Sequence, residues 1–306
     1  MSANRPHSEK NVHAHAPSAF GKAFAIAAIL NLGFVVVEIT YGLIAQSTAL
    51  LADAVHNTGD VLGLLLAWGA YTAAQRLPTG RYTYGFRSTT ILAALLNGMF
   101  LLVATGVILW EAVHRILHPM LVEGSVVIVV AAIGILINSF SAFLLSRGNK
   151  DLNIRSAFWH LAADAGVSAG VVVTGVIILY TGALWADPLA SIVISVAIVW
   201  STWSLLREAV TMSLDAVPSS IDAAEVTKYL EKLDGVVRIH DLHIWSISTS
   251  EVALTCHLVM PKGHPDDTFM GKVSDELQHT FGISHATLQS ELGTEDDCVL
   301  EPSEVV

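Results

Sequence analysis

The sequence predicts an α-helical membrane protein in which six transmembrane helices are followed by a small α+β domain. Of the 306 residues, 53% are hydrophobic and 14% are charged, a balance typical of membrane proteins. Six apolar segments are each long enough to span a bilayer, which requires about 20 residues. Eleven Lys and Arg accompany ten Asp and Glu up to Glu208, but five accompany seventeen from Ala209 onward. This acidic second part argues against a nucleic-acid partner.

The six apolar segments place the membrane domain at residues 18–208. In the fifth segment, Gly166 and Gly170 form a small-xxx-small pair, which we expect to pack against a neighbouring helix. The expected spans are residues 20–41, 48–73, 88–116, 122–145, 157–180 and 188–206.

Basic residues predict the orientation of these spans. Ten Lys and Arg lie on one side of the six-span topology, and Arg115 is the basic residue on the other side. Because cytoplasmic loops carry the excess of Lys and Arg, both termini should be cytoplasmic. Residues 1–17 are polar and contain His7, His13 and His15, so we expect a flexible cytoplasmic tail whose histidines either collect metal or bind it only weakly.

The acidic part of the chain has a mixed pattern of short elements. Helical spacing covers residues 219–233 and 269–281, and strand patterns cover 236–247, 252–260 and 285–292. This order, with room for one short strand before it, predicts a ferredoxin-like α+β domain at 209–292. Residues 293–306 are acidic and aperiodic, which predicts a loose tail.

Two near-copies of a His–Asp pair lie within the apolar part. His56 precedes Asp60, and His160 precedes Asp164, each by four residues. On a helix this spacing places both side chains on one face. Ionisable side chains inside a membrane helix are costly, so they indicate a functional site. A single such pair can also be a helix–helix hydrogen bond, but two pairs on separate spans favour a metal site.

In the six-span topology, the second and fifth spans are antiparallel, so each His would lie across from the Asp of the other pair. Two imidazoles and two carboxylates make a tetrahedral ligand set for Zn²⁺, with Cd²⁺, Co²⁺ and Ni²⁺ as alternatives. Protons compete with metal for the same atoms, so a site open to each compartment in turn could exchange metal for protons. Asp53, on the same face as His56, is either an outer partner of the imidazole or an interfacial residue.

These residues resemble the cation diffusion facilitator family, in its zinc-transporter branch. The resemblance extends from the first span to about Glu291. Its motifs are Asn31…Phe34…Glu38…Gly42, Ser47-Thr-Ala-Leu-Leu51, Asp53-Ala-Val-His56…Asp60, Arg81-Tyr-Thr-Tyr-Gly85, Ile91-Leu-Ala-Ala-Leu-Leu-Asn97, Asn153-Ile-Arg-Ser-Ala-Phe158-Trp-His160…Asp164, His240-Asp-Leu-His-Ile-Trp245 and Phe281-Gly-Ile-Ser-His285-Ala-Thr-Leu-Gln289.

The resemblance implies a homodimeric antiporter that exports cytoplasmic Zn²⁺ in exchange for protons and lies in the lipid bilayer of a bacterial inner membrane. It implies that His56, Asp60, His160 and Asp164 are the transport ligands. It also implies a regulatory or structural zinc site in the cytoplasmic domain. That site would use His240, His257 and His285, with Gln289 or Glu291.

Two family features are missing from the sequence. The loop at residues 78–87 contains no carboxylate or imidazole, so we expect no metal there. The loop at 146–155 is short and contains no His.

Two other classes of protein compete with a transporter. An intramembrane metal-dependent enzyme would keep one coordination position open for water, whereas four protein ligands saturate the ion. A membrane-anchored metal sensor would leave the buried His–Asp pairs unexplained. We therefore expect a secondary transporter and not an enzyme.

Overall fold

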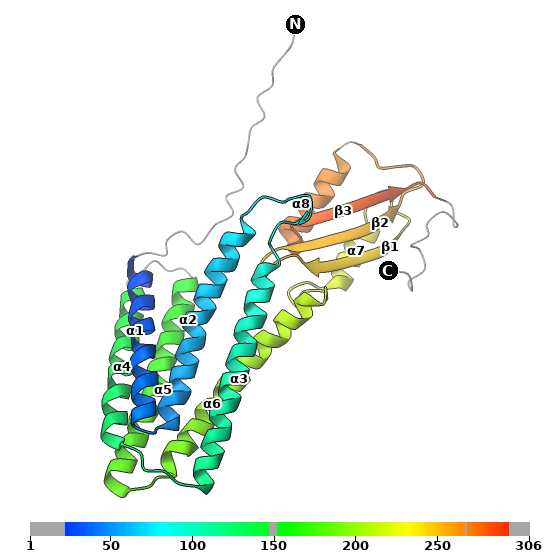
Figure 1. Cartoon of the computed structure of the whole chain (residues 1–306). Helices are drawn as coiled ribbons and strands as arrows, with labels where there is room; N and C mark the ends of the chain where they lie inside the picture. Colours follow the sequence, from blue (N-terminus) through cyan, green and yellow to red (C-terminus); the bar gives the residue numbers. More distant parts are fainter. Residues whose placement is uncertain (1–21, 147–151, 267, 294–306) are drawn as a thin grey trace. The chain divides into compact units, whose positions relative to one another are not determined.

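The computed structural model describes residues 22–146, 152–266 and 268–293, and it contains six long helices followed by an α+β domain (Figure 1). The N-terminal His residues and the acidic C-terminal tail lie outside the described residues. The long helices are α1 (Lys22–Ile44), α2 (Thr48–Ala74), α3 (Thr89–Leu117), α4 (Gly124–Ser146), α5 (Leu152–Thr181) and α6 (Ala186–Ser213). The predicted domain boundary after Glu208 falls within α6.

Five of the long helices are apolar enough to cross a membrane along most of their length: α1, α3, α4, α5 and α6. Helix α2 has 27 residues but is not among the five. It contains Asp53, His56, Asn57 and Asp60 within two turns, and these side chains lower its mean hydropathy. The protein is therefore a multi-pass helical membrane protein, and five of its six long helices are apolar enough to span a bilayer.

The described chain forms two compact units, and α2 and α6 each contribute to both. The first unit contains α1, α2 up to Ala54, α4, α5 and α6 up to Ala190. Within it, α4 packs against both α1 and α5 (Figure 1).

Glycines allow this close packing. A methyl group at Gly124 would lie 2.8 Å from the carbonyl oxygen of Gly175, and one at Gly134 would lie 2.6 Å from Cζ of Phe34. Among the described residues, no atom of another helix lies within 4 Å of a methyl group added at Gly166 or Gly170, so this pair does not make the contact between α4 and α5. The helix contact uses a glycine farther along α5 instead.

The second unit contains the rest of α2, α3, the rest of α6 and the α+β domain. Close contacts again occur at glycines. A methyl group at Gly63 of α2 would lie 2.9 Å from Nδ2 of Asn97 on α3. One at Gly98 of α3 would lie 3.1 Å from Cδ1 of Leu206 on α6. Helix α3 thus packs against both of the other helices in this unit.

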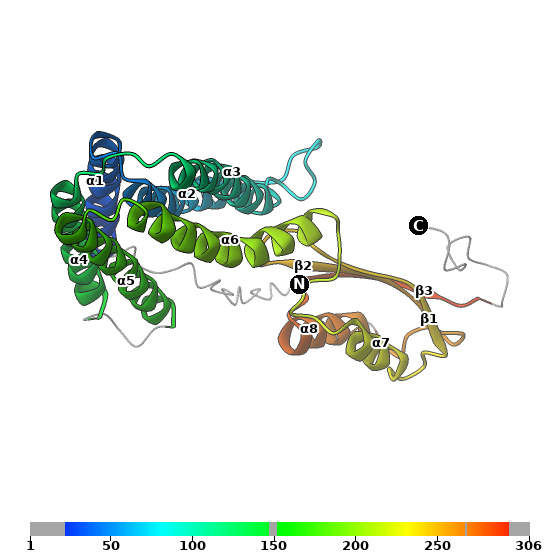
Figure 2. The same cartoon turned by 90° about the horizontal axis from the view of Figure 1, so that it is seen from below.

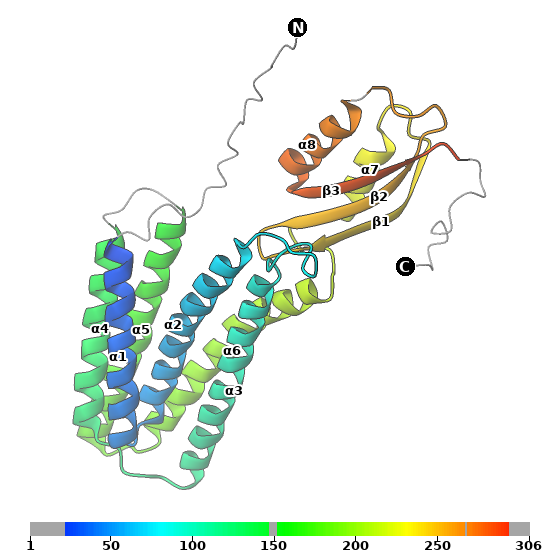
Figure 3. The same ribbon diagram turned by 45° about the horizontal axis from the view of Figure 1, so that its top comes forward.

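The α+β domain is a three-stranded sheet with two helices on one face (Figures 2 and 3). Strand β2 is central; it pairs antiparallel with β1 and parallel with β3. Apolar side chains between sheet and helices form the core, led by Leu230, Leu254, Leu258, Met260 and Leu277. The elements are α7 (Ala223–Glu231), β1 (Arg238–Ser246), β2 (Val252–Val259), α8 (Phe269–Phe281) and β3 (His285–Glu291).

The order of these elements agrees with the sequence prediction, but the strand count differs from a complete ferredoxin-like sheet. The described residues contain three strands and lack the short strand for which the sequence left room. Helix α7 is shorter than residues 219–233 because Asp222 caps it, accepting hydrogen bonds from the amides of Ala224 and Glu225. Helix α8 ends at Gly282, whose φ of 73° is a left-handed conformation that suits glycine.

The segment between α2 and α3 contacts the hairpin between β1 and β2 within the second unit. Arg87 Nη1 donates to Glu251 Oε1 at 2.8 Å, and Ser88 Oγ donates to the carbonyl of Ile247 at 3.2 Å. The amide of Thr249 donates to Oγ1 of Thr90 at 3.1 Å. Polar contacts therefore join the start of α3 to the sheet.

Candidate metal centres

The first His–Asp pair lies on α2, where the helix holds both side chains on one face. His56 Nε2 and Asp60 Oδ2 are 3.8 Å apart, and both side chains are half-buried. This separation is too long for a hydrogen bond. It is close to the roughly 3.4 Å that separates two ligand atoms on a tetrahedral zinc ion with bonds of about 2.0–2.1 Å. The pair is therefore spaced to bind one edge of such an ion.

The second pair, on α5, has the same spacing. His160 Nε2 and Asp164 Oδ2 are also 3.8 Å apart. The Asp164 side chain is buried, whereas that of His160 is exposed. The two pairs belong to different units of the structure, so the 3.8 Å spacing within each pair is described for that pair by itself.

Asp53 is a buried carboxylate in the first turns of α2. Its Oδ2 accepts a hydrogen bond of 2.9 Å from Oγ of Ser168 on α5. Ser168 follows Asp164 by one helical turn, so Asp53 connects α2 to the helix that carries the second pair. Ser168 was not predicted as a site residue from the sequence. Its four-residue spacing from Asp164 was the available signal.

Asp187, in the first turn of α6, is a second buried carboxylate that the sequence analysis missed. It accepts hydrogen bonds from Oγ of Ser47 at 2.5 Å, from the amide of Thr48 at 2.6 Å and from Oγ1 of Thr48 at 2.8 Å. The Ser47 hydroxyl in turn accepts from the amide of Leu50 at 3.1 Å. Asp187 therefore supplies negative charge to the N-terminus of α2, where the helix dipole favours it. The paired Ser47 and Thr48 were the available sequence signal.

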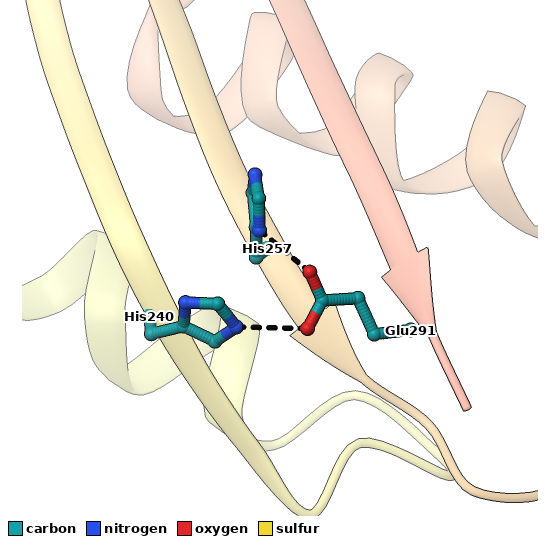
Figure 4. A group of neighbouring side chains, drawn as sticks. All are labelled: His240, His257 and Glu291. Carbon is teal, nitrogen blue, oxygen red and sulfur yellow. Dashed lines mark hydrogen bonds and ion pairs between the residues drawn. The ribbon is translucent and has the colours of Figure 1, made fainter. Parts of the chain in front are cut away.

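A third group of ligand residues lies in the α+β domain, on the sheet face opposite α7 and α8 (Figure 4). His240 Nε2 lies 2.9 Å from Glu291 Oε2, and His257 Nδ1 lies 2.7 Å from Glu291 Oε1. One ligand atom from each residue lies within 4.8 Å of the others. The side chains of His240, His257 and Glu291 are 8%, 11% and 16% exposed. Two imidazoles and a carboxylate in this shielded position are a suitable ligand set for zinc.

The strand register brings these three residues together. Leu254, Cys256 and Leu258 face the helices, so alternation turns His257 to the other face. His240 lies directly opposite His257 across the antiparallel pair, and Glu291 is two residues beyond Gln289, the parallel partner of His257. Each strand therefore contributes one ligand residue.

Two other residues implied by the family resemblance lie outside this group. His285 pairs with Ala253, four residues from His257 along β2, which is roughly 13 Å away at about 3.3 Å per residue. Its ring packs edge-on against Tyr84, with centroids 5.6 Å apart. His285 therefore does not join His240, His257 and Glu291 in one site. Gln289 lies beside the site, and its Nε2 donates to Glu291 Oε1 at 3.1 Å.

Cys256 neighbours this group but points into the core. Burial first, and then the negative charge of Asp241, raise the pKa of the thiol to about 12. Metals bind the thiolate and not the thiol. The group in the α+β domain therefore offers nitrogen and oxygen ligands.

Comparison with known proteins identifies the family. Residues 24–212 match the family model of the cation efflux transmembrane domain, and residues 218–292 match that of the cation efflux protein cytoplasmic domain. The chain belongs to the cation diffusion facilitator family. This confirms the resemblance stated from the sequence motifs, and it makes the α+β domain the cytoplasmic domain of a cation diffusion facilitator.

Similar members of the family are bacterial transporters. The chain is 35% identical to the zinc transporter ZitB of Escherichia coli over 93% of its own length and 92% of the relative. It is 32% identical to a cadmium, cobalt and zinc/H(+)-K(+) antiporter of Bacillus subtilis, over 91% of each chain. It is 33% identical to the metal cation efflux system protein CzcD of Cupriavidus metallidurans, over 92% of its own length and 89% of the relative. Membership in this family also confirms the prediction of a transporter rather than an enzyme.

Proposed function

We propose that this cation diffusion facilitator exports Zn²⁺ from the cytoplasm in exchange for protons. The observation that carries the proposal is the matched spacing of two His–Asp pairs, 3.8 Å in each, on two long helices. The transport ligands are His56, Asp60, His160 and Asp164. The similarity to ZitB and to a zinc/H(+)-K(+) antiporter supports both the metal and the proton.

The hydrogen bond between Ser168 and Asp53 supports joining the two pairs into one site. In antiparallel neighbouring helices, a step of one turn forward along α2 corresponds to one turn back along α5. One turn from the Asp53–Ser168 contact leads to His56 and Asp164, and a second turn leads to Asp60 and His160. Each His is then paired with the Asp of the other helix, as a four-ligand ion requires. Asp53 serves in this arrangement as the residue that maintains the helix register.

We place this site within six transmembrane spans, in which α2 joins the five more apolar helices, and we place both termini in the cytoplasm of a bacterial inner membrane. The excess of basic residues on one side of the topology supports this orientation. The ferredoxin-like cytoplasmic domain, residues 209–292, pairs with a second copy in a homodimer. It binds a regulatory or structural Zn²⁺ through His240, His257 and Glu291, whose donors suit the ion.

The test is uptake of ⁶⁵Zn²⁺ into proteoliposomes with an imposed pH gradient. Wild type should accumulate zinc and move protons in the opposite direction. His160→Ala and Asp60→Asn should each abolish flux, and Ser168→Ala should reduce it. His114→Ala is the matched control, because it removes an exposed imidazole from α3 and should leave flux unchanged. A wild type that moves no zinc, or a His160→Ala variant with normal flux, would refute the proposal.

Competition between metals tests the ligand assignment. Cd²⁺, Co²⁺ and Ni²⁺ should compete with Zn²⁺ because imidazole and carboxylate suit all four. Mn²⁺ and Mg²⁺ should compete poorly, since they prefer oxygen ligands. Transport of Mn²⁺ in preference to Zn²⁺ would contradict the assignment of two histidines to the site.

A further inference from the structure

Asp241 contacts the proposed cytoplasmic zinc site without belonging to its ligand set. Its Oδ2 lies 3.6 Å from Nε2 of His257, and its Oδ1 lies 2.9 Å from Nε2 of His243. His257 Nδ1 is already directed at Glu291. The ring of His257 thus lies between two carboxylates, one on each nitrogen.

A β-bulge gives Asp241 this position. His240 pairs with His257 and His243 pairs with Thr255, so two residues of β1 oppose the single residue Cys256 between those pairs. In a regular strand, neighbouring residues point to opposite faces, and Asp241 would point away from the His240 side. The extra residue of a bulge re-aims a side chain. Here both His240 and Asp241 reach His257.

The backbone of Asp241 is unusual as well. Its φ is 51°, in the left-handed region that few residues other than glycine adopt. Asp is one of the tolerated exceptions. Its side chain is only 12% exposed, so this conformation directs a carboxylate into the domain and not into solvent. Such backbone conformations cluster at functional sites.

The chemistry of histidine gives this arrangement a purpose. A neutral imidazole has one nitrogen that donates and one that accepts. If Nδ1 of His257 binds the ion together with His240 and Glu291, the proton must be on Nε2, which faces Asp241. Ligating histidines commonly donate their second nitrogen to a carboxylate, which fixes the ring and raises its basicity.

We propose that Asp241 is a positioning residue that fixes His257 in the tautomer that presents the lone pair of Nδ1 to Zn²⁺, and that His243 anchors the other oxygen of Asp241. This inference rests on the proposed cytoplasmic zinc site. The 3.6 Å separation between Nε2 of His257 and Oδ2 of Asp241 becomes a hydrogen bond when the two atoms approach by about 0.6 Å. An ion held by Asp241, His243 and Nε2 of His257 together is disfavoured, because the His257 ring would then lose its remaining N–H proton and bridge two metals as an imidazolate.

The inference is tested by zinc binding to the full-length chain in detergent. His160→Ala and Asp164→Ala remove the transport site in every sample, so that only ions in the cytoplasmic domain are counted. Competition with a chromophoric chelator gives the number of ions and their affinity. Asp241→Gly is the decisive variant, because glycine accepts a φ of 51° and lacks the carboxylate.

Asp241→Gly should bind the same number of ions with about 10- to 100-fold lower affinity. Without zinc, this variant should unfold at the same temperature as the parent. At saturation with Co²⁺, its visible spectrum should also match that of the parent. A general structural defect would change both properties. Asp241→Asn should restore part of the affinity, since its amide oxygen can accept from Nε2. His243→Ala should lower affinity less than Asp241→Gly.

His257→Ala separates the two proposals. If it fails to remove one bound ion, the cytoplasmic site itself is refuted, and the positioning role falls with it. If it removes an ion while Asp241→Gly binds zinc like the parent, only the positioning role is refuted. If Asp241→Gly loses an ion completely or alters the Co²⁺ spectrum, Asp241 is a direct ligand, and the proposal is again overturned.

Discussion

Asp187 should be among the most sensitive positions for stability in the membrane domain, although it contributes no proposed ligand. Replacing it with Ala removes the acceptor for the hydroxyl of Ser47 and for the amide and hydroxyl of Thr48. All three residues are fully buried, so water cannot replace the lost acceptor. The first turn of α2, five residues before Asp53, would lose its attachment to α6.

The magnitude follows from these contacts. A hydrogen bond to a charged group contributes about 1.5–3 kcal/mol. Three such bonds are not additive, because Ser47 and Thr48 can turn partly toward backbone carbonyls. We therefore expect a loss of about 3–5 kcal/mol, which is less than the sum of three such bonds. Asp187→Asn keeps one acceptor oxygen and should lose less.

The measurement is thermal unfolding in detergent, in which size-exclusion chromatography reports the fraction of folded protein left after heating. About 3–5 kcal/mol should lower the midpoint by roughly 10 °C in a domain of this size. Ser191→Ala is the matched control: it removes a buried hydroxyl one turn along α6, which finds no hydrogen-bond partner among the described residues. That variant should unfold within a degree or two of wild type. A shift for Asp187→Ala no larger than that of Ser191→Ala would refute the capping role.

Three other predictions follow from single contacts. Gly124→Ala should lower the unfolding temperature, because its methyl group would lie 2.8 Å from a backbone carbonyl oxygen. Gly170→Ala is the control and should be neutral or slightly stabilising, because no described atom of another helix lies within 4 Å of its methyl group. Equal effects of the two substitutions would contradict the packing described. The side chains of Arg87 and Glu251 are 40% and 34% exposed, so a double-mutant cycle should give a coupling energy of at most about 1 kcal/mol, which salt should weaken. A coupling energy above about 2 kcal/mol would contradict the assignment of a solvent-screened ion pair. With Cys298 replaced by serine, Cys256 should react with thiol reagents at a rate that rises with pH toward the thiol pKa of about 12, since only the thiolate reacts. A plateau of the rate near pH ~9 would contradict this pKa.

Much of the helical architecture was predictable because the bilayer imposes a length of about 20 apolar residues on each span. The ends of the helices were less predictable. The sixth span was expected to end at residue 206, yet α6 continues to Ser213. Hydropathy marks where lipid contact ends and not where backbone hydrogen bonding ends. Residues 48–73 were the best-predicted helix by their bounds, since α2 begins at Thr48 and ends at Ala74.

The candidate sites differed in the same way. The i, i+4 spacing of each membrane His–Asp pair needs only one helix, so the spacing alone predicts that the two side chains share a face. The cytoplasmic group needs three strands in a particular register. His285 was included with His240 because both resemble family positions. The parallel register, however, places His285 at the start of β3, at the opposite end of the strand from Glu291. Asp241 was missed because simple alternation would turn it away, and a bulge cannot be derived from the residues that form it.

The proposed cytoplasmic zinc site also bears on the lifetime of the protein in a cell. His240 and Glu291 are 51 residues apart in the chain, and β3 is joined to the sheet along one edge. An ion shared by the three strands would add about 2.7 kcal/mol to the stability of the domain at a free concentration 100 times its Kd. In zinc-poor cells β3 would detach more often and expose the domain to proteases. The abundance of the exporter would then follow the supply of the metal that it exports.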